Sequence, residues 1–506
     1  MTQGILPFKY EAATEKTGMT SLGGLPLYMD LAHVMGLRKS IREHIGVRRE
    51  SQGWTDNQIV TSLLLLNLAG GESVEDLKVL ESDAGFCRIL HRVETHGLRR
   101  KERRELERRW RKEKRRTVPS SSAVFRYLAA FHNPEQEKLR QLGKAFIPES
   151  NKYLDSFSKV NRDFLSFVQS NSLCATATLD MDATLVETSK ESAVYCYKGF
   201  KSYQPLNTWW AEQGLVVHTE FRDGNVPAGY KQLRVFQEAL NCLPSGVEKV
   251  MLRSDTAGYQ HNLLKYCASG ENKRFGEIEF AIGCDVTKEF KKAVSEISES
   301  DWQPLHKAYD GVKIKTGTEW AEVCFVPNAI GHSKSGPEYR YIAKRTVIRQ
   351  QDLPGIESQQ ELPFPIMKMQ SIKYKIFGIV TNMDWEGERL INWHHERCGK
   401  SEEAHSIMKK DLAGGRVPSN DFGENAAWWW IMILALNLNA AMKSLVLGKS
   451  WVTKRMKAIR FSLINLPARV LERSRSLLIR IMKGHPMHDY LLEFRRKILM
   501  LIPAPG

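Results

Sequence analysis

The chain has 506 residues, of which 42% are hydrophobic and 26% are charged. This length predicts two to four domains, and the composition excludes both wholesale disorder and a polytopic membrane protein. Lys and Arg number 74 against 58 Asp and Glu, a formal net charge of +16. This excess favours a polyanionic partner, with nucleic acid ahead of an anionic membrane surface.

The cysteines and the N-terminus bear on the compartment. The eight cysteines are scattered singly with no Cys-x-x-Cys pair, which argues against zinc-ribbon and thioredoxin chemistry. Single cysteines at this density suit a reducing compartment. The first residues, MTQGILPFKY, lack a basic segment followed by an apolar core, so we expect no signal peptide and a cytoplasmic protein.

The first 170 residues are predicted to be helical, with short breaks. Thr55 is a plausible N-cap for one helix and Gly70 a stop, and Ser120 to Ser122 precede another amphipathic helix. Short helices with tight turns in a basic context fit a helix-turn-helix-like DNA-binding region. A plain helical bundle fits the same pattern equally well.

Positive charge is concentrated in two segments. Residues 99–116 hold twelve basic and four acidic residues, and residues 451–500 hold twelve basic and three acidic residues. One such segment is commonly a solvated helix, but two of them flanking a near-neutral middle favour a surface that follows DNA. Within the first segment, the candidate phosphate contacts are Arg108, Arg109 and Arg111.

From residue 171 the pattern changes to α/β. Residues 171–284 predict three antiparallel strands leading into alternating helix and strand, and residues 285–375 predict a β-rich insertion. The same architecture resumes over residues 376–450. Residues 451–506 are predicted as a basic helical C-terminal region.

One apolar stretch, Ala426 to Leu447, is long enough to suggest a membrane span. It contains Asn437, Asn439 and Lys443, and its strongly apolar part is short. A buried core helix is therefore the preferred interpretation, and no membrane partner is expected.

Acidic residues stand at positions where active sites of open α/β sheets form. Asp182 lies on the first predicted strand, with Asp180 two residues earlier on the same face. Asp255 ends a later strand, and Glu402 lies at a helix start. Each has an ordinary alternative: a strand-edge charge, a helix cap, or an acid that favours the helix dipole.

Together these acids predict a metal site. Three carboxylates converging on one sheet edge suit Mg²⁺ or Mn²⁺, and such a site can hold two ions. Two ions can activate water and stabilise the leaving oxygen of a phosphodiester.

Four motifs taken in order carry a family resemblance. TLDMDATLVE, FRDGNV, LRSDTAGY and HHERCGKSEEAHSIMKKDL resemble a DDE-class bacterial insertion-sequence transposase. The resemblance is closest to insertion sequence family 1380, related to the group whose last motif is Tyr-x2-Arg-x3-Glu-x6-Lys. It implies a ribonuclease-H-like catalytic core with a β insertion before the final acid.

The resemblance assigns the acids. Asp182, followed by Ala-Thr, matches the first acid better than Asp180, and Asp255 matches the second. The family glutamate is followed seven residues later by a lysine, which Glu402 with Lys409 satisfies. Glu403 with the next lysine also fits and ranks second.

The same motifs suggest DNA contacts. Arg397 matches the family arginine, and Lys409 is expected to meet a phosphate while Glu402 binds metal, since seven residues return to the same helix face. Arg253 is a further candidate. The family tyrosine is missing and His394 occupies that region, while the interval from Arg397 to Glu402 is one residue longer than in the pattern.

The implied activity is DNA transposition. Such enzymes cut at the inverted terminal repeats of an element and join its 3′-hydroxyl ends to target DNA, and a homodimer is expected in the DNA complex. Some relatives form a DNA hairpin with help from a tryptophan in the insertion, for which Trp302 and Trp320 are positioned, although core packing suits both. The resemblance also implies a bacterial, nucleoid-associated protein.

Three other functions remain as alternatives. A catalytically silent DNA-binding protein of the same fold is the main one, though the acids, Arg397 and Lys409 are all retained. A different nuclease on this fold would lack the β insertion and the Glu-x6-Lys helix. A peripheral membrane protein would use the amphipathic C-terminal segment.

Overall fold

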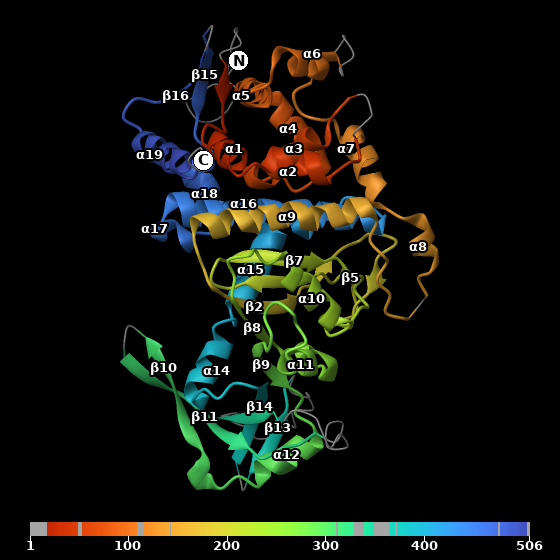
Figure 1. Cartoon of the computed structure of the whole chain (residues 1–506), viewed down its shortest axis with the longest axis vertical. Helices are drawn as coiled ribbons and strands as arrows, with labels where there is room; N and C mark the ends of the chain where they lie inside the picture. The colour runs from red at the N-terminus through yellow and green to blue at the C-terminus, as the bar shows by residue number, and fades with distance from the viewer. Residues whose placement is uncertain are drawn as a thin grey trace, which may run out of the picture.

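The computed structural model describes residues 18–48, 53–108, 116–141, 143–309, 312–327, 339–348, 364–369, 372–473 and 476–502. Figure 1 shows helices from the N-terminal third at one end, a large sheet at the other, and a layer of long helices between them. Arg109 and Arg111 lie outside the described residues. The protein is of mixed α/β class.

The N-terminal region is helical, as predicted. Thr55 forms a capping box with Gln58, Gly70 ends that helix with a positive φ of 103°, and Ser120 accepts a hydrogen bond from Ala123 N. The helices are α1 (Pro26–Val34), α2 (Leu37–His44), α3 (Asp56–Ala69), α4 (Leu77–Ser82), α5 (Ala84–Glu94), α6 (Arg100–Arg108), α7 (Ser121–Leu128), α8 (Pro134–Lys138) and α9 (Lys152–Asn171).

A ten-stranded sheet organises the rest of the chain, in the order β10-β11-β12-β14-β9-β8-β2-β6-β7 with β13 paired to β14. Strands β2, β8 and β9 are mutually parallel neighbours, whereas β6 and β7 run antiparallel on the other side of β2. The strands are β2 (Thr176–Ala183), β6 (Leu206–Trp210), β7 (Leu215–Glu220), β8 (Lys249–Ser254), β9 (Glu279–Cys284), β10 (Gln303–Tyr309), β11 (Val312–Val323), β12 (Arg340–Val347), β13 (Ile366–Met369) and β14 (Ile372–Thr381).

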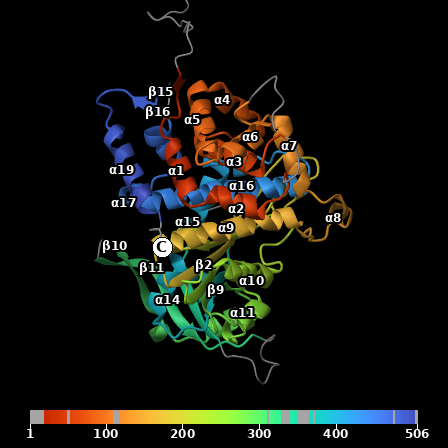
Figure 2. The same ribbon diagram turned by 45° about the horizontal axis from the view of Figure 1, so that its top comes forward.

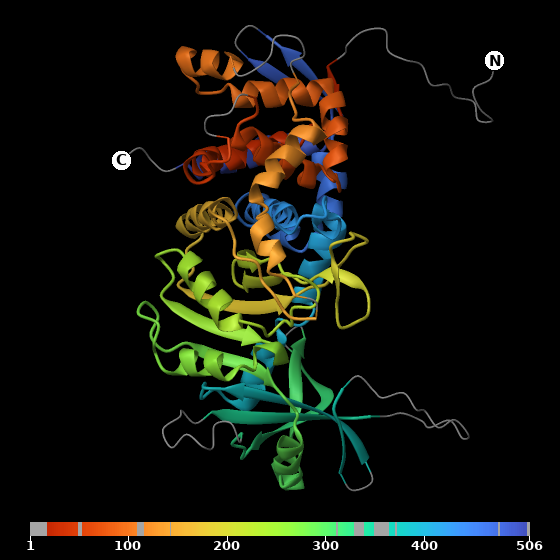
Figure 3. The ribbon, with the colours of Figure 1, turned by 90° about the vertical axis from the view of Figure 1, so that its right-hand side faces the viewer.

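The strand-rich segment from β10 to β14 extends this sheet instead of forming a separate one, because β14 pairs directly with β9. Figure 3 shows these strands at the end of the molecule farthest from the N-terminal helices. The helices associated with the sheet are α10 (Gln232–Cys242), α11 (His261–Ala268), α12 (Lys288–Ser295), α14 (Gly387–His395) and α15 (Lys400–Ser406). A small separate sheet consists of β3 (Val186–Glu187), β4 (Val194–Tyr195) and β5 (Lys201–Tyr203).

Helix α16 (Phe422–Ala441) is the central core helix, packed against α3, α9 and β7 (Figure 2). Phe422–Leu447 is the one described helical segment long and apolar enough to cross a membrane, and 78% of its most apolar window is buried. Its asparagines are satisfied inside the protein: Asn437 donates to Val216 O at 2.8 Å, and Asn439 Oδ1 accepts from Tyr28 OH at 2.9 Å. The interpretation as a buried core helix is confirmed.

The prediction of an entirely helical C-terminal region is wrong. After α17 (Lys449–Val452) and α18 (Met456–Ile459), a hairpin of β15 (Ala468–Glu472) and β16 (Leu477–Ile481) pairs with β1 (Met19–Thr20), and α19 (Met487–Met500) follows. Arg460 donates to Leu68 O at 2.8 Å, and Arg495 pairs with Asp30 at 2.8 Å. Several of the tail's basic side chains therefore join the two ends of the chain.

Candidate active site

Two of the predicted acids lie at one edge of the sheet. Strands β2 and β8 are parallel with Met181 opposite Ser254, so that Asp182 and Asp255 emerge side by side at the strand ends. Asp255 also accepts a hydrogen bond from Ala257 N at 3.0 Å, as the N-cap of a short 3₁₀ turn. The capping alternative is therefore correct as well, and it holds the carboxylate in place.

The third acid comes from α15, which follows α14 after a short turn. Glu402 is exposed and accepts a hydrogen bond from Gly399 N at 2.6 Å, at the N-terminus of its own helix. Its charge acts on the Asp182 carboxyl, whereas the charge of Glu403 acts on Lys443 and Arg455. Of the two candidates, Glu402 is therefore the one whose charge is felt at Asp182.

The electrostatics of Asp182 reveal a cluster of acids. Burial raises the pKa of Asp182 most, Arg397 lowers it, and the carboxylates of Asp255 and Glu402 raise it further, to about 7. The Arg397 guanidinium lies 3.8 Å from the Asp182 carboxylate, too far for a close ion pair. The charges of Asp255 and Glu402 thus act on Asp182, and the Arg397 guanidinium opposes them.

Asp180 has a different role. Its carboxylate accepts hydrogen bonds from Arg253 Nε at 2.7 Å and Arg253 Nη2 at 2.9 Å, and Arg253 also donates to Trp393 O. Asp180 is 5% exposed and Arg253 is 1% exposed. The prediction of Arg253 as a DNA contact is wrong in this structure, because its guanidinium is buried and committed to Asp180 beneath the sheet edge.

The turn after α14 brings two more predicted residues to the site. Arg397 is 8% exposed beside Asp182, so it contacts the first acid instead of standing free on the surface. His394 is also buried, its Nε2 donating to the carbonyl of Ser254 at 3.0 Å, and burial lowers the pKa of His394 so that the ring is neutral. His394 in α14 and Arg397 in the turn after it therefore both contact the sheet edge.

Lys409 reaches the same edge by an unexpected route. The α-helix ends at Ser406 and continues as a π-helical turn, Ile407–Asp411, so the seven-residue α-helical spacing to Glu402 does not apply. The Lys409 ammonium donates to Leu185 O at 3.0 Å, in the turn that directly follows the strand of Asp182. Burial, reinforced by Lys410 and Lys198, lowers the pKa of Lys409.

The acids suit a hard divalent cation in their chemistry, since carboxylate oxygens are the ligands that such ions prefer. They are not a closed ligand set: among the described residues, no three His, Cys, Asp or Glu side chains are spaced to hold an ion. One oxygen of the Glu402 carboxylate accepts a hydrogen bond from Gly399 N, and the second oxygen is the one that could join a metal.

Other sequence candidates lie elsewhere. Arg108 ends α6, away from the sheet edge (Figure 1). Trp302 is 7% exposed beneath Arg345, and Trp320 is 5% exposed against Gly387, so core packing is the correct interpretation for both tryptophans.

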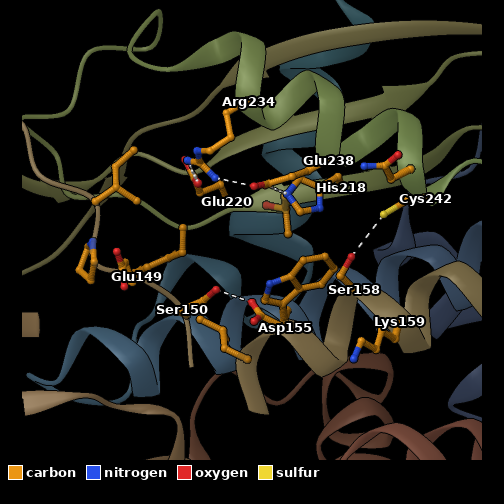
Figure 4. Close-up of a pocket in the computed structure, with 18 of the residues that line it drawn as sticks. Glu149, Ser150, Asp155, Ser158, Lys159, His218, Glu220, Arg234, Glu238 and Cys242 are labelled. Atoms are coloured by element: carbon orange, nitrogen blue, oxygen red, sulfur yellow. Dashed lines mark hydrogen bonds and ion pairs between the residues drawn. The ribbon is translucent and has the colours of Figure 1, made fainter. Parts of the chain in front are cut away.

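A cavity of about 690 Å³ between α9, α10, β7 and α16 is not this site, because it is lined by none of the three acids. Figure 4 shows its polar wall, where His218 pairs with Glu238 at 3.1 Å and Ser158 lies 3.3 Å from the Cys242 sulfur. Burial lowers the pKa of His218, but hydrogen bonds with Cys242 and Glu238 outweigh it and raise the value to about 9.

Comparison with known proteins identifies the class. The mixed sheet, two aspartates at adjacent strand ends and a glutamate on a following helix fit the DDE class predicted from the motifs. The family model described as transposase DDE domain group 1 matches residues 9–502, so the chain belongs to this family and is a DNA-cutting and strand-transferring transposase.

Two further comparisons were made. No curated protein matches the sequence. Among solved structures, a cryo-electron-microscopy structure of a piggyBac transposase synaptic complex with hairpin DNA is similar over 97% of this chain and 84% of that chain, with 12% identity and a TM-score of 0.38. The assignment above depends on the family model.

Proposed function

We propose that this transposase cuts at the inverted terminal repeats of a bacterial insertion sequence and joins the 3′-hydroxyl ends to target DNA. The order of its motifs supports placement near insertion sequence family 1380. The sheet of β6, β7, β2, β8 and β9 would be its ribonuclease-H-like core. It would act as a nucleoid-associated homodimer on paired DNA ends.

The observation that carries the proposal is that Asp182 and Asp255 directly follow the last paired residues of adjacent parallel strands, with the charge of Glu402 acting on the Asp182 carboxyl. These carboxylates would hold Mg²⁺ or Mn²⁺, two ions in all, which would supply Lewis-acid activation of the attacking and leaving oxygens. Like charges near one another are unfavourable, so the effect of Asp255 and Glu402 on Asp182 gives the site a physical reason to bind a cation.

The residues of the chain have separate tasks in the reaction. In cutting, a water oxygen forms a bond to phosphorus as the bond to the 3′ oxygen breaks, and that oxygen leaves as a 3′-hydroxyl after taking up a proton. In joining, the 3′-hydroxyl attacks a target phosphate and displaces the target's own 3′ oxygen. Arg397 orients the Asp182 carboxylate, and Lys409 fixes the turn at Leu185 beside it.

The test is cleavage of labelled duplexes carrying the DNA ends that flank the gene. We expect nicking at the element boundary with Mg²⁺ or Mn²⁺, no nicking without metal, and no nicking by Asp255→Ala at unchanged duplex affinity. Binding without cleavage by the folded wild-type protein under both metals would instead support the catalytically silent DNA-binding protein.

A further inference from the structure

One face of the strands β12, β13 and β14 is unusually basic. We call it the basic strand surface, and it consists of Lys307, Lys344, Lys368, Lys373 and Lys375 with Phe364, Phe377 and His395. Register places its main members on one face: Lys344 stands opposite Phe377, Lys368 stands opposite Lys373, and residues 373, 375 and 377 alternate along β14. Lys307 acts electrostatically on both Lys344 and His395.

Within the described part of the chain, no acid balances the positive charge of this surface. None of its five lysines forms an ion pair with an acid among the residues that the structure describes. Lys368 and Lys373 are like charges directly across two strands, an arrangement that is destabilising unless an anion approaches. The opposite face differs: Arg345, next to Lys344, pairs with Glu299 at 2.6 Å and Glu319 at 2.7 Å.

Aromatic rings hold the lysines in place. The Lys375 ammonium lies 4.2 Å from the ring centre of Phe364 and 4.7 Å from that of Phe377, and the Lys344 ammonium lies 5.2 Å from Phe377. Phe377 remains 41% exposed. Lys344 is 9% exposed, and burial, with Lys307 and Lys375, lowers its pKa to about 8. Lysines positioned around an exposed ring suit an extended anion that carries flat groups.

The surface begins at the catalytic edge. The Lys344 ammonium contacts His395 Nε2 at the end of α14. The preceding residue, His394, is hydrogen-bonded to Ser254 immediately before Asp255, and Arg397 lies two residues later beside Asp182. Figure 1 shows α14 running along these strands toward the strands that carry the aspartates.

We propose that the basic strand surface binds the sugar-phosphate backbone of duplex DNA where it leaves the catalytic acids. Lys373 and Lys375 contact phosphates, and Phe377 packs against the deoxyribose between them. This inference rests on the proposed function, since it assigns a surface to the DNA that the active site cuts. Lys344, held by His395, positions the surface relative to the acids.

The test compares two charge-matched double variants. Lys373→Gln/Lys375→Gln removes two charges from the surface, and Lys288→Gln/Lys292→Gln removes two exposed charges from α12, which packs on the opposite face of β14 near Gly378. Affinity for a duplex containing an element end and its flank is measured from 50 to 300 mM salt. Each lost phosphate contact lowers the salt slope by about 0.9.

We expect the surface variant to lose about two units of slope and at least ~10-fold affinity at low salt, while the α12 variant matches wild type. Equal slopes for the two variants would overturn the proposal.

Wild-type protein supplies a second measurement: lysine acetylation read by mass spectrometry, with and without duplex. DNA must protect Lys373 and Lys375 but not Lys288 and Lys292. Protection that instead grows with protein concentration in the absence of DNA would identify a contact between copies of the chain and overturn it.

The cleavage assay separates the two proposals. Suppose that the wild-type protein does not cut the element ends but the surface variant shows a smaller salt dependence of duplex affinity. The proposal for the basic strand surface is then supported, and the proposed reaction is wrong. If the wild-type protein cuts the element ends and both variants have the same salt slope, the proposed reaction is supported and the proposal for the basic strand surface is wrong.

Discussion

Asp180 and Asp182 lie two residues apart on one strand and face the same way, yet their surroundings are opposite. Asp180 has a guanidinium within 2.7 Å that satisfies both of its oxygens, whereas Asp182 has its nearest guanidinium at 3.8 Å and two other acids acting on it. A buried charge with a close partner belongs to the architecture. A half-buried acid with only a long ion pair and two other acids acting on it is instead a candidate for binding a cation from outside.

The largest expected effect comes from Asp182, the aspartate without a close ion pair. Asp182→Asn should reduce cleavage in Mg²⁺ by at least ~10⁴-fold, about 5.5 kcal/mol, because the amide is a poor ligand for a hard cation. Cleavage rates with labelled element ends measure this, and circular dichroism monitors folding. A variant that retained a tenth of the activity would remove Asp182 from the catalytic set.

Substitution of Asp180, the aspartate paired with Arg253, should lower the free energy of unfolding. Asp180→Asn removes the closer of the two carboxylates paired with the buried Arg253 guanidinium and leaves Glu396 at 3.3 Å, so the free energy of unfolding should fall by about 3 kcal/mol. Urea denaturation measures this change. Combining Asp180→Leu with Arg253→Met removes both charges and should recover most of the loss, whereas a double variant no more stable than Asp180→Asn would contradict this account.

Asp182 should also make the stability of the protein depend on pH. A folded pKa of about 7 for Asp182, above its unfolded value, means that stability is fully present at low pH and falls as pH rises from about 4 to about 7. At pH 8 without metal, Asp182→Asn should be more stable than wild type by about 2–3 kcal/mol. Thermal melts from pH 5 to 8 test this, and Mg²⁺ should narrow the difference by stabilising only the wild type.

The smallest difference separates the adjacent glutamates. Glu402→Gln should slow cleavage by about 10- to 100-fold, because its charge acts at the Asp182 carboxyl, while Glu403→Gln should stay within about twofold of wild type. The same cleavage assay compares both proteins. The reverse order would move the third acid to Glu403 and pair it with Lys410.

Much of this site is predictable from the sequence, because the strands that carry it are encoded by short-range patterns. Alternating β-branched residues predict the strand before Asp182, and LRSD followed by a helical pattern predicts a strand end at Asp255. Parallel strands put such ends at one edge, which the register of β2 and β8 confirms. The apolar helix at Phe422 was likewise predictable as core, since asparagines within it need partners that a bilayer lacks.

The failures share a cause, because each concerns a contact between distant segments. Arg253 appears in the sequence as an ordinary basic residue beside an acid, and nothing local reveals that Asp180, 73 residues earlier, buries it. The hairpin of β15 and β16 has apolar spacing that also suits a helix, and pairing with β1 near the other end of the chain decided between them. The domain boundaries, the DNA contacts and the metal ligands stay predictions.

The sequence by itself determined the class of the protein, the strand-end aspartates and the buried central helix, because each depends on short-range periodicity or on an ordered set of motifs. Only the tertiary structure decided that Asp180 pairs with Arg253, that the charge of Glu402 acts on Asp182, and that Arg253 lies inside. It also showed that the lysines around Phe377 gather on one face. Charge pairing depends on distance in space, and the chain order alone does not specify which charges the fold brings within reach.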